Sequence, residues 1–476
     1  MSIPDHQKLS RAALTAMVVG SMVGAGIFSL PARFGSATGP FGALISWTIA
    51  GGGMLTLAWV FQTLAVRRPG IDAGIYAYAR EGFGAYPGFA AAFGFWAGTC
   101  LGNTTYFILI KSTLGAILPV FGDGNTPVAV AVSSALLWLI HALVLRGIKE
   151  AAFINQIVTA AKIVPIVLFV VILAFAFQAD LFAEGFWGGG AFESANLLGQ
   201  IRSTMLVTVF VFIGIEGASV YSRFARTRRD VGWATIAGFA GVMGLLVLVT
   251  LLPYGVVPRA ELAAMRQPSM GGVLAQVVGP WGSWFVGIGL IVSVLGAYLA
   301  WTLLAAEVLY SAARSGLAPA WLARENAKGV PAAALWLTNG LVQFFLISTL
   351  FSQEAFDLAL EMTSAITLVP YVLVAAYGCK VAKAAQGYAG EPRAARRDLI
   401  VAGLATVYAV FMIYAGGLKY LLLSCLLFAP GTALFIFARR ERGERVFSRR
   451  EKCLFGVIVA GALAAVGALA SGAIAI

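Results

Sequence analysis

Apolar residues dominate this chain in long stretches that recur from end to end. Thirteen such segments cover roughly residues 11–32, 42–66, 88–119, 127–145, 155–178, 203–222, 231–255, 283–311, 333–351, 358–379, 399–415, 419–438 and 454–474. A helix needs about 20 mostly apolar residues to cross a bilayer. We therefore predict an all-α polytopic membrane protein, a single transmembrane domain over residues 1–476 with about 13 transmembrane helices.

Lysine and arginine are distributed unevenly between the predicted loops. If the N-terminus is cytoplasmic, 26 of the 33 basic residues fall in inside loops, and two, Lys111 and Lys162, fall within spans. The outside loops hold only five: Arg33, Arg202, Arg259, Arg266 and Lys419. Basic residues accumulate in cytoplasmic loops because they resist translocation. We expect an integral plasma (inner) membrane protein with its N-terminus in the cytoplasm and its C-terminus outside.

Composition supports a membrane protein and argues against several other classes. The chain is 60% hydrophobic and 11% charged, too little charge to cover a soluble protein of this length. The net charge of +12 follows the topology and suits anionic lipid, so we expect no nucleic-acid partner. The four cysteines show no paired spacing, and the two histidines, His6 and His141, are far apart. We therefore expect no disulfide framework, no metal site and no cofactor.

Two segments carry glycine near the middle of a predicted span. These are Gly20–Phe28 and Phe210–Ala218. Glycine frees the backbone to unwind, and unwound backbone at that depth is tolerated only where it lines a protein cavity. The glycines could instead serve only close helix packing. The two segments correspond if 11–178 and 203–379 are five-helix repeats of opposite orientation, followed by three peripheral helices over 399–474. That 5+5 inverted repeat favours a transporter with its site at the two breaks.

Six pieces of sequence resemble a known family. They are Gly20–Pro31, Gly74–Arg80, Leu101–Asn103, Phe212–Gly217, Trp301–Ala305 and Thr367–Tyr371. At these residues the chain resembles the amino acid–polyamine–organocation superfamily, especially its basic amino acid/polyamine antiporters of the arginine–ornithine branch. The resemblance implies the leucine-transporter fold, with broken helices 1 and 6, and exchange of a cationic amino acid for its product.

Candidate substrate-binding residues come from the breaks and from the resemblance. An α-carboxylate suits free N–H groups at a half-helix N-terminus, near Ala25 and Gly26. An α-ammonium suits the carbonyls exposed at the breaks, those of Met22 and of Phe210 or Val211, with Gly214 in the second break. The resemblance implies that Trp301 is an aromatic wall for the cationic side chain and that Phe210 is a gate. It also implies a distal pocket lined by Gly98, Thr99, Asn103, Tyr106, Thr363 and Ser364.

Ionisable residues inside spans are costly and therefore indicate function. Glu216 follows the second break and could bind the substrate cation, carry a proton or accept hydrogen bonds from the unwound backbone. Lys162 stands where the resemblance implies an ammonium in place of a bound sodium ion, hence sodium independence, with proton coupling left open. Lys111 lies near a predicted span end, where we interpret it as reaching toward the interface.

We predict an antiporter that works by alternating access, with arginine for ornithine as the first choice of substrates. Lysine–cadaverine, histidine–histamine and arginine–agmatine exchange, or proton-coupled uptake, remain alternatives. We expect no enzyme, because the spans carry no HExxH motif and no plausible Ser–His dyad. A receptor is disfavoured because no loop is long enough for a sensor domain. The expected partners are small cationic amino acids and membrane lipid, and a homodimer is left open.

Overall fold

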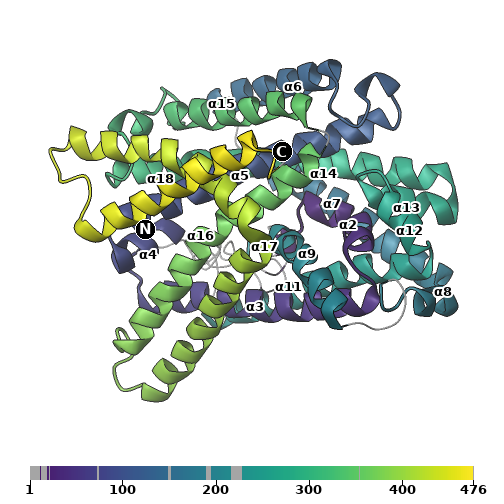
Figure 1. The fold of residues 1–476 in the computed structure, drawn as a ribbon, viewed down its shortest axis with the longest axis horizontal. Coiled ribbons are helices and arrows are strands. Elements are labelled where there is room, and N and C mark those ends of the chain that lie inside the picture. The colour runs from purple at the N-terminus through teal and green to yellow at the C-terminus, as the bar shows by residue number, and fades with distance from the viewer. Residues whose placement is uncertain are drawn as a thin grey trace. The chain divides into compact units, whose positions relative to one another are not determined.

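A computed structural model describes residues 11, 15, 19–20, 22–71, 74–147, 152–188, 194–215, 228–352 and 354–474 of the chain. Every regular element in these ranges is helical (Figure 1). The α-helices are α2 (Leu30–Ala37), α3 (Pro40–Arg67), α4 (Ile75–Phe83), α5 (Ala85–Gly115), α6 (Pro127–Leu145), α7 (Ala152–Ala176), α8 (Ala179–Glu184), α9 (Ser194–Phe212), α11 (Arg228–Leu251), α12 (Arg259–Ala264), α13 (Ser269–Val278), α14 (Pro280–Arg314), α15 (Ala332–Ser348), α16 (Ala355–Lys383), α17 (Pro392–Glu441) and α18 (Arg449–Ala470). The 3₁₀ helices are η2 (Ala25–Ser29), η3 (Pro119–Phe121), η5 (Leu252–Gly255), η6 (Ala320–Ala323) and η7 (Thr349–Phe351).

Nine helices in the described ranges are long and apolar enough to cross a membrane: α3, α6, α7, α11, α14, α15, α16, α17 and α18. The protein is therefore an all-α integral membrane protein. One of the nine, α17, covers two predicted segments, 399–415 and 419–438. Its backbone leaves the helical region between them, at Gly417 (φ 82°, ψ 170°). The helix count of thirteen stays a prediction.

The chain forms two compact units, each built from two stretches. The first unit is Met1–Val66 with Ala152–Ala297, and the second is Arg67–Ala151 with Tyr298–Ile476. The predicted halves, 11–178 and 203–379, concern the order of repeats in the sequence. These units do not test that order, so the halves stay a prediction.

In the first unit, the short helix α2 is fixed near both of its ends. The N–H of Ala32 donates to Ser269 Oγ over 3.0 Å, which satisfies one of the N–H groups that lack a partner in a first helical turn. Near the other end, Arg259 Nε donates to the Gly35 carbonyl over 3.0 Å, and Nη1 of the same side chain donates to the Gly188 carbonyl. Helices α12 and α13 therefore determine where α2 begins and ends.

Replacing Arg259 by glutamine should destabilise the protein. The guanidinium bonds the Gly35 and Gly188 carbonyls at once, and a hydrogen bond from a charged donor contributes about 1.5–3 kcal/mol. We expect a lower thermal unfolding temperature in detergent. Arg259→Lys, which keeps the charge but lacks the planar fork, should recover only part of the loss. Full recovery by lysine would show that charge alone matters, and an unchanged unfolding temperature in Arg259→Gln would contradict the role assigned to these bonds.

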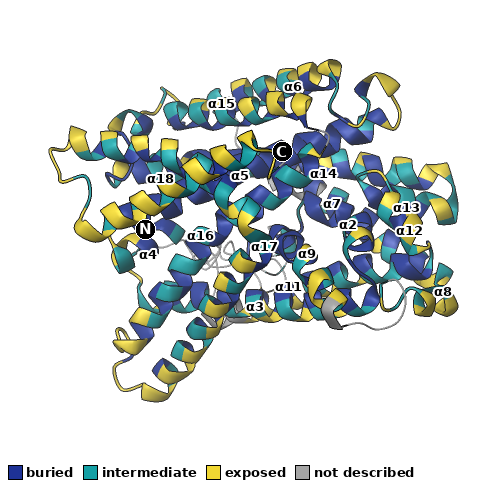
Figure 2. Ribbon diagram, in the orientation of Figure 1, coloured by how far each residue is buried: buried dark blue, intermediate teal, exposed yellow. Residues whose placement is uncertain are grey.

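In the second unit, α5 is buried along almost its whole length (Figure 2). Its small residues allow α16 to approach closely. A methyl group added at Gly98 would lie 2.7 Å from Thr367 Oγ1, and one at Gly94 would lie 3.2 Å from the Ile366 carbonyl. By contrast, α18 buries only Ala465 among its residues and presents a largely exposed apolar surface that suits lipid. Helix α5 therefore belongs to the interior of this unit.

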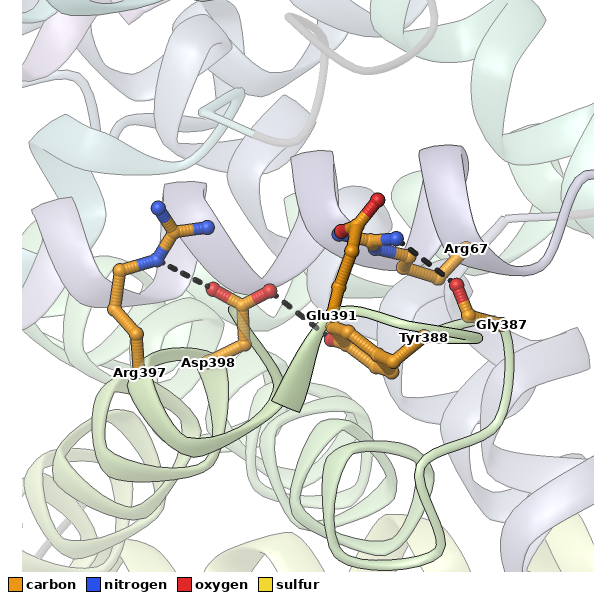
Figure 3. A network of polar contacts seen from close by, with 6 residues as sticks. All are labelled: Arg67, Gly387, Tyr388, Glu391, Arg397 and Asp398. Carbon is orange, nitrogen blue, oxygen red and sulfur yellow. Dashed lines mark hydrogen bonds and ion pairs between the residues drawn. The ribbon is translucent and has the colours of Figure 1, made fainter. Parts of the chain in front are cut away.

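A network of polar contacts fixes the connection between α16 and α17 (Figure 3). Arg67 Nη1 donates to the Gly387 carbonyl over 2.9 Å, and Nη2 pairs with Glu391 at 2.6 Å. The same guanidinium lies 4.2 Å from the centre of the Tyr388 ring. The Tyr388 hydroxyl donates to Asp398 Oδ2 over 3.0 Å. The network holds this loop against Arg67, the last residue of α3.

Stability should fall at high pH because of Tyr388. Burial raises the pKa of its hydroxyl to about 12, and the Asp398 carboxylate adds to the shift. The folded-state pKa lies above the ordinary value of about 10. The stabilisation is therefore complete below pH 10 and is lost as the pH rises toward 12. Over this range, the unfolding temperature of Tyr388→Phe should fall less than that of the wild type. Equal slopes for the two proteins would contradict the assignment.

Candidate functional site

One group of predicted site residues lies in the first unit, where the backbone leaves the helical conformation. Met22 is helical, Val23 and Gly24 are not, and η2 begins at Ala25 and continues directly into α2. Met22 is 2% exposed and Ala25 is 1% exposed. This interrupted backbone is therefore buried in protein, which is where a membrane protein tolerates non-helical backbone.

A second interruption follows α9. This helix ends at Phe212, and Gly214 adopts φ +106°, a conformation that favours glycine. The Phe210 carbonyl, predicted to bind an α-ammonium, accepts a hydrogen bond from the Ile213 N–H over 3.3 Å. A carbonyl oxygen has two lone pairs, so this one can accept a further bond. Glu216 lies outside the described residues, and its alternative roles stay predictions.

Gly26 in η2 packs directly against the last turn of α9, just before the second interruption. A methyl group added to Gly26 would lie 2.7 Å from Cδ1 of Phe210 and 2.8 Å from Cγ1 of Val211. Both separations are shorter than any that real Cβ atoms adopt, so this approach requires glycine. The structure thus brings together two of the residues predicted from the glycine pattern and the resemblance. The role of Phe210 as a gate stays a prediction.

Lys162 contacts the backbone just before the first interruption. Its ammonium donates to the Gly20 carbonyl over 3.3 Å, and the side chain is 6% exposed. Gly20 lies in helical conformation ahead of the interruption at Val23 and Gly24. The carbonyls at the end of a helix attract positive charge. The Lys162 ammonium therefore stabilises the end of the first half-helix.

In the second unit, Asn103 presents a buried acceptor. Asn103 is 1% exposed, and its Nδ2 donates to Thr302 Oγ1 over 3.1 Å. Its Oδ1 has no hydrogen-bond partner within the described part of the chain. Trp301 precedes Thr302 on α14, is partly exposed, and lies 6.4 Å from the Phe95 ring, centre to centre. A buried, unpaired acceptor and a half-buried aromatic ring therefore lie on two packed helices.

The other predicted pocket residues have well-defined local contacts. The hydroxyls of Thr99, Thr363 and Ser364 donate to carbonyls one turn earlier in their own helices. The hydroxyl oxygens of Thr99 and Thr363 can still accept a bond. Tyr106 is 7% exposed. Gly98 packs against α16, and that packing explains the glycine without a substrate contact. Binding by these residues stays a prediction.

The interpretation of Lys111 as reaching toward the interface is wrong. Its side chain is 1% exposed, and Nζ donates to Thr349 Oγ1 over 3.1 Å. The turn after α5 folds back over it, because a methyl group on Gly124 would lie 3.0 Å from Lys111 Cβ. Hydrophobic periodicity does not predict that a following segment packs back onto its own helix. For this reason the sequence indicated an exposed span end at Lys111, whereas the lysine is buried.

Sequence reasoning also missed a set of buried polar residues in the second unit. Tyr298 donates to Asn339 Oδ1 over 3.0 Å, and Asn339 Nδ2 lies 2.9 Å from His141 Nδ1. His141 was considered only as a metal ligand. Histidine and asparagine are unfavourable inside apolar segments, so their presence there indicates a specific partner or function. This was the signal that could have identified these residues from the sequence.

Comparison with known proteins identifies the family. The family model described as amino acid permease matches residues 9–419. This chain belongs to the amino acid permease family. The permease is 49% identical to an arginine/ornithine antiporter of Pseudomonas aeruginosa, over 99% of each chain. It is 41% identical to an L-lysine transport protein of Corynebacterium glutamicum, over 97% of this chain and 95% of the other. It is also 38% identical to an arginine/agmatine antiporter of Chlamydia abortus, over 97% of this chain and 96% of the other.

Proposed function

We propose that this permease exchanges one cationic amino acid for a related product by alternating access, and that the pair is arginine and ornithine. The observation that carries the proposal is the full-length similarity to the Pseudomonas aeruginosa arginine/ornithine antiporter, 49% identical over 99% of both chains. The L-lysine transport protein and the arginine/agmatine antiporter named above are less similar to this chain, at 41% and 38%.

In the first unit, we propose that the interrupted backbone binds the part common to all α-amino acids. The N–H groups near Ala25 and Gly26 open the helix formed by η2 and α2, where positive helix-dipole charge suits a carboxylate. The carbonyls of Met22 and Phe210 suit the α-ammonium. The close approach of Gly26 to the Phe210 side chain supports this assignment, because it places η2 against the last turn of α9, just before the second interruption.

In the second unit, we propose that Asn103 and Trp301 recognise the cationic side chain. A guanidinium or ammonium offers only donors, and Asn103 Oδ1 is a buried acceptor without a partner among the described residues. The face of Trp301 would attract the same cation by about 0.5–2 kcal/mol. The hydroxyl oxygens of Thr99 and Thr363 would supply further acceptors.

We further propose the leucine-transporter fold, with an inverted repeat, broken first and sixth helices, thirteen spans and a cytoplasmic N-terminus. Support comes from the non-helical backbone at Val23 and Gly24 and from the end of α9 at Phe212. It also comes from Gly417, which separates two predicted spans within α17. The Lys162 ammonium at the Gly20 carbonyl supports transport that needs no sodium ion.

A transport assay separates the proposed pair from its alternatives. We would measure uptake of labelled arginine into proteoliposomes that are empty or preloaded with ornithine, agmatine, lysine or histamine, without sodium or pH gradients. Uptake with ornithine inside and not with agmatine or histamine would support arginine–ornithine exchange. Uptake driven by agmatine would favour amine antiport, which moves net charge because the amine lacks the carboxylate. Uptake into empty vesicles under a pH gradient would indicate a proton symporter.

A further inference from the structure

The segment that joins α17 to α18, residues 439–452, carries a large excess of positive charge. We call it the basic connection. It lies between two helices that are apolar and long enough to cross a membrane. Its seven basic residues are Arg439, Arg440, Arg442, Arg445, Arg449, Arg450 and Lys452, and its three acidic residues are Glu441, Glu444 and Glu451. Whether the basic connection can bind an anion depends on which of these cations the carboxylates neutralise.

At the α17 end of the basic connection, the acidic residues are occupied by contacts within the protein. Glu441 Oε2 accepts a hydrogen bond from the Ala320 N–H over 2.9 Å. Glu444 forms an ion pair with Arg439, whose Nε and Nη2 also donate to the Arg445 carbonyl over 3.1 Å and 2.9 Å. These contacts hold the end of α17 in place, and they neutralise Arg439 alone among the basic residues.

At the α18 end, the Glu451 carboxylate binds backbone N–H groups. Its Oε1 accepts from the Tyr86 N–H over 2.8 Å at the start of α5, and its Oε2 accepts from the Ser448 N–H over 2.7 Å. The Ser448 hydroxyl accepts from the Glu451 N–H, which completes a capping box at the start of α18. The carboxylate that neighbours Arg449 and Arg450 in the sequence is therefore already used by the fold.

Six basic side chains of the basic connection stay exposed. None of them forms an ion pair with a residue in the described ranges; they are Arg440, Arg442, Arg445, Arg449, Arg450 and Lys452. Like charges this close in the chain repel one another, and an anion bound among them removes that repulsion. Arginine suits phosphate in particular, because its planar fork donates two parallel hydrogen bonds. The basic connection therefore has the charge and the donors to bind a phosphate group.

Helix α18 continues from these cations with an exposed apolar face. Only Ala465 of this helix is buried (Figure 2). Arg450, Leu454 and Val457 follow at spacings of four and three, so they lie on the same side of the helix. Leu454 is 39% exposed and Val457 is 68% exposed. A cation in line with exposed apolar side chains matches a phospholipid, whose phosphate lies at the membrane surface next to its acyl chains.

We propose that the basic connection and the first turns of α18 form a binding site for an anionic phospholipid. The arginines at the start of α18 hold the phosphate, and an acyl chain lies along Leu454 and Val457. The occupant is a lipid and not a soluble anion, because the cations and the exposed apolar side chains share one side of one helix. This site goes beyond the proposed function, in which α18 has no role.

The test measures lipid binding to the full-length protein in detergent by native mass spectrometry. The probes are phosphatidylglycerol and phosphatidylcholine with identical acyl chains. We expect the wild type to bind one phosphatidylglycerol in preference to phosphatidylcholine. The double variant Arg449→Gln, Arg450→Gln should lower the affinity for phosphatidylglycerol by roughly thirtyfold, which is about fivefold for each basic residue near a membrane surface. Its affinity for phosphatidylcholine should stay unchanged.

Two matched variants separate this site from total charge. Arg324→Gln, Lys328→Gln removes two exposed cations from the connection between α14 and α15 in the same unit. We expect it to bind phosphatidylglycerol like the wild type. Arg449→Lys, Arg450→Lys keeps the charge and should retain most of the preference, so it carries the test if the glutamine variant does not fold. Glycerol phosphate, which lacks acyl chains, should not displace the bound lipid.

Several results would overturn the lipid site. They are equal wild-type affinities for the two lipids, an unchanged preference in Arg449→Gln, Arg450→Gln, and an equal loss in Arg324→Gln, Lys328→Gln. Displacement of the lipid by glycerol phosphate would show that the cations bind a soluble anion. A lipid-free wild-type dimer that the glutamine variant cannot form would assign the surface to a second copy of the chain. None of these measurements involves transport, so failure of this proposal leaves the proposed function standing, and the reverse also holds.

Discussion

Replacing Gly26 by alanine should abolish most exchange activity. The new methyl group would lie 2.7 Å from the Phe210 ring and 2.8 Å from Val211, so these two side chains would have to shift or η2 would have to move away from α9. Overpacking of this kind costs about 1–3 kcal/mol. If that cost falls on substrate binding, affinity drops by roughly 5- to 150-fold, since about 1.4 kcal/mol corresponds to tenfold. The measurement is ornithine-driven arginine uptake, together with the unfolding temperature.

Gly52→Ala is the matched control for Gly26→Ala. Gly52 lies on α3 in the same unit, and an added methyl group would have nothing within 4 Å. Alanine in a helix interior is favoured over glycine by about 1 kcal/mol, so Gly52→Ala should transport normally and unfold at the same or a slightly higher temperature. Normal transport by Gly26→Ala would show that the close approach to Phe210 is not needed for substrate binding.

Replacing Lys162 by methionine should also cause a large loss of exchange. The Lys162 ammonium donates to the Gly20 carbonyl at the end of the first half-helix. Methionine would leave this carbonyl without the donor, at a cost of about 1–3 kcal/mol for a buried group, and would remove the charge that suits a helix end. We expect exchange to fall at least about tenfold, as measured by initial rates in proteoliposomes.

Two comparisons test the role of Lys162. Lys162→Arg keeps a cationic donor and should retain more activity than Lys162→Met. Exchange by the wild type should be the same in sodium and choline buffers, because the lysine ammonium would already occupy the place of a sodium ion. Equal activities of the methionine and arginine variants, or a wild-type rate that depends on sodium, would contradict this role.

The sequence could predict the elements of the fold because their signals are local. Apolar runs of about 20 residues located the spans, and nine helices of the described part have the required length and composition. The gap predicted between 415 and 419 coincides with Gly417, where the backbone leaves the helical region. The glycines of the first break coincide with non-helical backbone at Val23 and Gly24. Gly417 has a positive φ, which other residues avoid, whereas Gly24 is in extended conformation that any residue can adopt.

The contacts between helices could not be predicted in the same way. The division into two units depends on which spans pack together, and no span carries that information by itself. Lys111 was expected near an exposed span end. The turn that follows α5 packs back onto it, and such a tertiary contact cannot be predicted from the local sequence. Asn103 was predicted through the resemblance, but the contacts of Asn339 with Tyr298 and His141 join side chains from three helices. Polar residues within apolar spans indicate that some specific contact is present. They do not indicate which residue is the partner.

The most direct test of the central claim is simultaneous measurement of both fluxes. Proteoliposomes loaded with carbon-labelled ornithine are mixed with tritiated arginine while the membrane potential is clamped at several values. We predict that one ornithine leaves for each arginine that enters, at a rate independent of potential, because both amino acids carry the same net charge. Arginine entry without ornithine exit, or a ratio that changes with potential, would contradict exchange of these two amino acids.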